Sequence, residues 1–88
     1  MIKIHNISVY HRFYDLFSNS FIDNYCEARQ RGKSKKESFY IAKLTLRDLV
    51  INELSHRRNK SIVLAVFHDL KNDQELYEKA LSTFGRMN

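Results

Sequence analysis

The 88-residue sequence contains no proline, no tryptophan, only two glycines and one cysteine. Multi-stranded folds need turn residues that tolerate positive φ. Because the sequence has only two glycines, it offers few positions for the turns of β-hairpins. A lone cysteine cannot form an internal disulfide, and small secreted domains commonly depend on several, so we expect a reducing, cytoplasmic location. The composition therefore favours helices over a disulfide-rich fold.

Long apolar runs are also missing. In the first thirty residues, charged and imidazole side chains interrupt each apolar stretch well before the length of a membrane span or signal-peptide core, so we expect no membrane partner. The chain is nonetheless 43% hydrophobic, with six Phe and five Tyr, which is too apolar for an intrinsically disordered segment. Its length supports one domain covering residues 1–88.

Apolar residues recur at helical spacing in four stretches. We expect helices over about residues 8–31, 35–57, 61–71 and 73–84. Gly32 suits the left-handed conformation that follows a last helical turn, and Gly85 marks the end of the fourth helix in the same way. Ser34 and Glu37 have the spacing of a capping box at the start of the second helix.

The second helix has an apolar surface that covers roughly half its circumference, because its main stripe is widened by Ile41, Leu44, Ile51 and Leu54. We therefore expect it to be the central helix, packed on two sides. The first helix carries an unusually aromatic stripe from Tyr10 to Tyr25. Core packing is the favoured interpretation of that stripe, and an exposed interface for a partner or a second copy is the alternative.

Residues 61–67 are ambiguous, because six consecutive apolar residues rich in β-branched types fit either a buried helix or a buried strand. We favour a helix with Ser61 as its cap. A strand would need a partner, which only the alternating residues 1–7 offer, so a two-stranded α+β fold stays as the minority alternative. The prediction is an all-α fold, a compact bundle of three to four helices.

Positive charge is unevenly distributed. Residues 1–58 contain eleven Lys and Arg against six Asp and Glu, whereas residues 59–88 contain four of each. Cations at the end of the second helix suit its negative terminus, but Lys35 and Lys36 occupy the first turn of that helix, where the dipole disfavours them. Lys36, Tyr40, Lys43 and Arg47 share one helical face at steps of four, three and four. The candidate binding residues are Arg29, Arg31, Lys33, Lys35, Lys36, Tyr40, Lys43, Arg47, Arg57 and Arg58.

Chemistry-bearing motifs are missing from the sequence. Four histidines and Cys26 show no ligand spacing typical of a metal site, and there is no glycine-rich phosphate loop and no serine elbow. Nothing around Cys26 would lower the pKa of its thiol, so we expect a core or boundary residue there. We expect a non-enzymatic protein without metal or cofactor.

Two functional hypotheses follow. The leading one is a small basic protein that contacts nucleic-acid backbone, DNA or RNA, through the turn between the first two helices and the basic face of the second. The alternative is an adaptor or inhibitor that docks on an acidic protein surface, such as a small regulator carried by a virus or mobile element. A homodimer also stays open.

Overall fold

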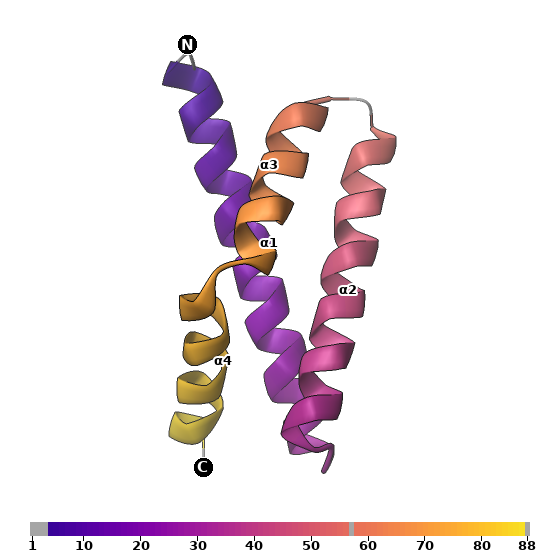
Figure 1. Ribbon diagram of the computed structural model, residues 1–88, viewed down its shortest axis with the longest axis vertical. Coiled ribbons are helices and arrows are strands. Elements are labelled where there is room, and N and C mark those ends of the chain that lie inside the picture. The colour runs from indigo at the N-terminus through magenta and orange to yellow at the C-terminus, as the bar shows by residue number, and fades with distance from the viewer. Residues whose placement is uncertain (1–3, 57, 88) are drawn as a thin grey trace.

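The computed structural model describes residues 4–56 and 58–87, and within these ranges it contains four α-helices and no strand (Figure 1). The helices are α1 (Ile4–Gln30), α2 (Lys35–Ser55), α3 (Lys60–Lys71) and α4 (Gln74–Met87). The expected all-α bundle is therefore confirmed. The α+β alternative is wrong, because residues 61–67 lie inside α3 and residues 4–7 begin α1, while residues 1–3 lie outside the described part of the chain.

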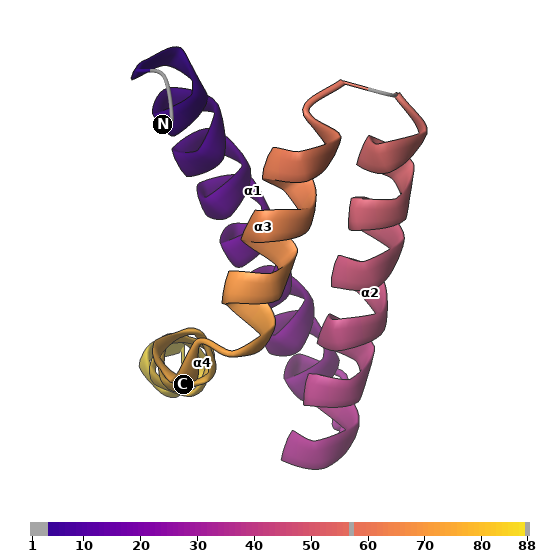
Figure 2. The ribbon, with the colours of Figure 1, turned by 45° about the horizontal axis from the view of Figure 1, so that its top comes forward.

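The central helix is α1, not α2 as the sequence suggested. It packs against α2, α3 and α4, and the other three helices lie around it (Figures 1 and 2). With 27 residues at 1.5 Å each, α1 extends about 40 Å, which accounts for most of the 43 Å length of the molecule. The helices α2 and α3 run side by side in both views, joined at the end remote from the α1–α2 turn.

The turn between α1 and α2 follows the sequence signals closely. Gly32 has a φ of 91°, and its amide donates to the Arg29 carbonyl while the Lys33 amide donates to the Ala28 carbonyl. This pair of bonds is the Schellman motif that ends a helix. At the start of α2, the Ser34 hydroxyl accepts a hydrogen bond from the Glu37 amide at 3.1 Å. These two caps reverse the chain direction within four residues.

Three boundaries differ from the expectation. The helix α1 begins at Ile4, about one turn earlier than expected. The cap position of α3 is Asn59 in a left-handed conformation, so Ser61 lies inside the helix and does not cap it. The helix α4 continues through Gly85 to Met87, because Gly85 keeps a negative φ there. The capping aspartate of α4 is Asp73, whose Oδ1 accepts from the Glu75 amide.

The aromatic stripe of α1 forms the core, as the favoured interpretation predicted. Phe17, Phe21 and Tyr25 are buried, and Tyr25 packs against Phe39 of α2 with ring centroids 4.3 Å apart. Phe21 meets Tyr77 of α4 edge to face. The other sides of this core come from α2, α3 and α4, and the buried apolar residues that complete it are Cys26, Ala42, Leu46, Val50, Val63, Val66, Leu70, Leu76 and Ala80.

Two tyrosines connect α1 to the α3–α4 junction. The Tyr10 hydroxyl donates to Asp69 Oδ2, and the Tyr14 hydroxyl donates to Asp73 Oδ2. Burial and the bond to Asp69 raise the pKa of Tyr10 to about 12. The bond to Asp73, together with burial, also raises the pKa of Tyr14. Both phenols are therefore protonated over the physiological range, as the hydrogen bonds require.

Within the described residues, no helix is long and apolar enough to cross a membrane.

Candidate functional site

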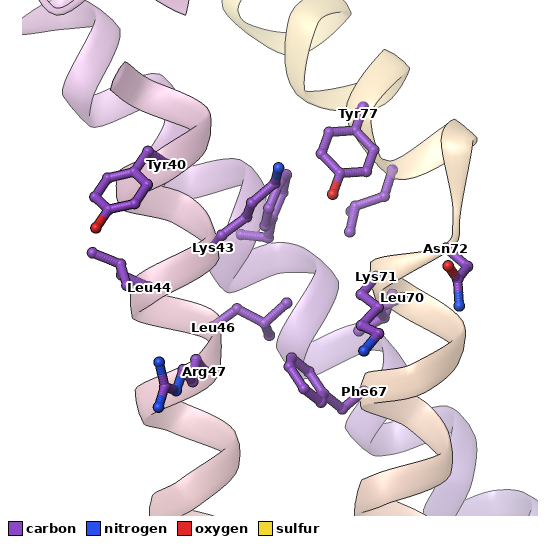
Figure 3. A pocket seen from close by; sticks show the side chains of 12 residues that line it. Tyr40, Lys43, Leu44, Leu46, Arg47, Phe67, Leu70, Lys71, Asn72 and Tyr77 are labelled. Atoms are coloured by element: carbon purple, nitrogen blue, oxygen red, sulfur yellow. The ribbon is translucent and has the colours of Figure 1, made fainter. Parts of the chain in front are cut away.

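A groove lies between α2 on one side and α3 with the start of α4 on the other, with a volume of about 430 Å³ (Figure 3). Its floor is made of buried side chains, namely Phe21, Leu46, Leu70 and Leu76. The side chains at its rim and walls come from α2 (Tyr40, Lys43, Leu44 and Arg47), from α3 and its C-terminal end (Phe67, Lys71 and Asn72) and from α4 (Tyr77).

All charged side chains that line this groove are cations. Lys43 and Arg47 stand on the α2 side and Lys71 on the α3 side, and none of the described lining residues is Asp or Glu. The Lys43 ammonium lies over the Tyr77 ring, 5.5 Å from its centroid, and Lys71 lies over Phe67 at 5.9 Å. Such cation–π contacts hold the aliphatic stems against apolar surface and leave the charge accessible to an anion.

A neighbouring hollow extends the groove toward the N-terminus of α2. It is lined by Lys36, Phe39, Tyr40, Lys43 and Tyr77. The basic face expected from the sequence therefore lies along one edge of the groove, with Tyr40 between its cations. Tyr40 is 63% exposed, more than any other large apolar or aromatic side chain described.

Large apolar side chains stand in solvent beside the groove. Leu44 is 40% exposed, Ile51 52% and Leu64 51%. Ile51 follows Arg47 by one turn of α2, and Leu64 precedes Phe67 by one turn of α3. Helical spacing therefore places Ile51 on the same side of α2 as Arg47, and Leu64 on the same side of α3 as Phe67. The helix α2 contacts both α1 and α3, but Leu44 and Ile51, which broaden its apolar surface, stay exposed.

Two of the candidate arginines are engaged within the protein. The Arg29 Nη1 donates to the Lys33 carbonyl at 2.9 Å, and its guanidinium lies 4.8 Å from the centre of the Phe84 ring. Arg29 thus closes the end of α1 onto α4. Arg31 pairs with Glu27 at 2.6 Å, which is the one ion pair among the described side chains.

The remaining candidates fall into two places. Lys33, Lys35 and Lys36 are exposed around the α1–α2 turn, next to the basic edge of the groove at Lys36. Arg58 is exposed in the α2–α3 connection, at the opposite end of α2, and Arg57 lies outside the described residues. The structure therefore brings together Lys36, Tyr40, Lys43 and Arg47, and it separates Arg58 from them.

Sequence reasoning missed the far wall of the groove. Phe67 and Tyr77 belong to apolar stripes that indicate core, and Lys71 sits where a cation suits the end of a helix. The available signal was the excess of apolar residues on α2. Of the four residues that widen the apolar stripe of α2, Ile41 and Leu54 are partly buried, whereas Leu44 and Ile51 are exposed.

Other reactive groups offer no site. Cys26 is buried, and desolvation raises the pKa of its thiol. Among the described residues, no group of three or more His, Cys, Asp or Glu is placed to hold a metal ion. Comparison with protein-family models, curated proteins and solved structures finds no match for this chain. The groove is therefore the feature of the described residues on which a function can be based.

Proposed function

We propose that this protein is a non-enzymatic binding protein that docks its α2–α3 groove on an acidic segment of a protein partner. The observation that carries the proposal is the combination of an apolar floor with a rim whose only charges are cations. An apolar groove gains free energy from apolar surface that a partner buries in it, about 25 cal/mol per Å². The cations add attraction and orientation for carboxylates at the edges.

A protein segment fits this groove better than nucleic-acid backbone does. Phosphates and sugars would contact the cations but supply no apolar surface for the exposed Leu44 and the half-buried Phe67. The faces of Phe67 and Tyr77 are already covered by Lys71 and Lys43, which leaves Tyr40 as the ring most open to stacking with a base. Exposed aliphatic residues beside a groove are typical of protein interfaces.

Partner capture with matched variants tests the proposal. Leu44→Glu places a carboxylate in the groove wall, whereas Leu81→Glu changes a residue of nearly equal exposure, 39% against 40%, on α4 outside the groove. A partner captured by the wild type is purified and its affinity measured by calorimetry at about 50 and 200 mM salt. We expect Leu44→Glu to weaken binding at least tenfold and Leu81→Glu to leave it unchanged. Equal effects of the two variants would contradict docking in the groove.

Nucleic-acid backbone binding is the second candidate. One observation favours it: Lys33, Lys35 and Lys36 are all exposed at the α1–α2 turn, where the α2 amides also point outward, and none has a carboxylate partner among the described side chains. Direct binding to labelled duplex DNA, single-stranded DNA and RNA at about 50 and 200 mM salt tests it.

The same variants separate the two candidates. Reversal of Lys36, Lys43 and Arg47 to Glu should abolish nucleic-acid binding, whereas Leu44→Glu should weaken it far less than this triple reversal. Affinity for phosphates should also fall steeply with salt. Absence of binding to every nucleic acid at the lower salt would eliminate this candidate and leave the protein partner.

A further inference from the structure

We infer that the segment held in the groove is an amphipathic α-helix with acidic flanks, which completes a four-helix bundle with α1, α2 and α3. The inference rests on the proposed docking function and specifies its partner. The backbone around the groove is helical: both walls are helices, and the described residues contain no strand. An extended segment would find no sheet edge here with which to form main-chain hydrogen bonds. A helix satisfies its own backbone, so it needs only side-chain contacts.

The spacing of the wall residues favours a helical occupant. Along α2, Tyr40, Leu44 and Arg47 line the groove and Ile51 lies one turn further on, at steps of four, three and four. Along α3, Phe67 and Lys71 line the groove and Leu64 lies one turn before Phe67, at steps of three and four. These are the seams along which a neighbouring helix packs in bundles and coiled coils. The ends of the α2 seam, Tyr40 and Ile51, are eleven residue steps apart, or about 16 Å, which corresponds to about three turns of a partner helix.

Charge identifies the kind of helix. Cations stand on both walls, with Lys43 and Arg47 on one side and Lys71 on the other. A partner helix would therefore carry its apolar stripe between two rows of Asp and Glu. A second copy of this chain is a poor occupant, because its net charge is +5 and its own α2 edge carries the same cations. Like charges placed opposite each other disfavour that pairing.

A displayed library of random peptides of about 16 residues tests the inference, since shorter peptides form helices poorly. Selection is made on the wild-type protein, with counter-selection on Leu44→Glu and with Leu81→Glu as the control for general surface effects. Circular dichroism checks that both variants keep the wild-type helix content. We expect selected peptides to share apolar residues at i, i+3 or i+4, and i+7, flanked by Asp and Glu.

The strongest selected peptide is then synthesised. We expect its helix content to rise on binding, a proline at its centre to weaken binding at least tenfold, and the Lys43→Glu, Arg47→Glu double variant to weaken it at least tenfold. Acidic peptides that depend on Leu44 but lack helical spacing, or that tolerate the central proline, would overturn the helix and leave the docking function standing. Failure to select any Leu44-dependent peptide would overturn both.

Sedimentation of the wild-type protein and of Leu44→Glu tests whether a second copy of the chain occupies the groove. We expect both to sediment as monomers at micromolar concentration, because the groove repels its own copy. A dimer that Leu44→Glu dissociates would identify a second copy as the occupant and would overturn the acidic partner helix.

Discussion

Ser38 should be a site where alanine stabilises the protein. It is 0% exposed on the buried face of α2, which it shares with Ala42 and Leu46, and its hydroxyl has no hydrogen-bond partner among the described residues. Keeping a hydroxyl away from water without a partner costs about 1–3 kcal/mol. Alanine is also the better helix former, by up to about 0.5 kcal/mol. Only the dispersion contacts of one oxygen atom are lost, each about 0.1–0.2 kcal/mol.

These contributions give a net gain of about 1 kcal/mol for Ser38→Ala, which corresponds to a rise of about 4–8 °C in Tm for a domain of this size. Urea unfolding followed by circular dichroism measures it, with the slope checked to be unchanged. Two further serines serve as references. Ser34→Ala removes the α2 cap and should lose about 1 kcal/mol. Ser61→Ala changes an exposed position of α3 and should stay within about 0.5 kcal/mol of the wild type.

The sign of the stability change in Ser38→Ala decides whether the buried hydroxyl stabilises or destabilises the protein. A loss of 1 kcal/mol or more in Ser38→Ala, with Ser34→Ala and Ser61→Ala behaving as expected, would show that the buried hydroxyl contributes a favourable interaction. That result would refute the prediction that the unpaired hydroxyl oxygen destabilises the fold. A larger side chain provides a second test. Ser38→Leu should destabilise the protein by about 1–3 kcal/mol, because the serine is fully buried and the added atoms would overpack the core.

Three further predictions use other parts of the chain. Gly32→Ala should destabilise by about 1–2 kcal/mol in urea unfolding because of its positive φ, whereas Gly85→Ala, inside α4 with open space at its Cβ, should be neutral or stabilise by up to about 1 kcal/mol. The pKa of Tyr10 is raised to about 12, so folding favours its protonated form. The resulting contribution to the free energy of unfolding is complete below pH 10 and is lost between about pH 10 and 12. Tyr10→Phe should therefore reduce the decline of the urea midpoint over that pH range. Lys36→Glu should raise stability by about 0.3–1 kcal/mol, since it replaces a cation in the first turn of α2, and should weaken partner binding in the same preparation.

Most of the helices could be predicted from the sequence, because the residues that begin and end them act over a few positions of the chain. Gly32 and Ser34 fix the α1–α2 turn through bonds that span only a few residues, so their spacing alone predicted it. The ends of α3 and α4 were less accessible. Asn59 adopts a left-handed conformation, which is uncommon even for Asn, so the residue type alone did not predict it. Gly85 does not end its helix, because its φ is not positive and the helix continues through it.

The identity of the central helix was not readable, and the reason is physical. A broad apolar surface on α2 predicts burial on two sides, but periodicity does not distinguish burial within the chain from burial against another molecule. Only the structure shows that α1 covers one side of α2 and that Leu44 and Ile51 stand in solvent. The basic edge of the groove was readable from steps of four and three on one helix. Its far wall required α3 and α4 to be placed.

The departures from local rules on α2 gather on one side of that helix. Lys36 is a cation where the helix dipole favours an anion, and Leu44 and Ile51 are aliphatic residues left in water. On the opposite face, Ala42 and Val50 obey every packing rule. Stability of the isolated chain explains the second group and not the first. Leu44 lines the groove, Lys36 lines the hollow that extends it, and Ile51 lies one turn beyond Arg47. Because sequences tend to break local rules where function requires it, the proposed binding at this groove would account for all three exceptions together.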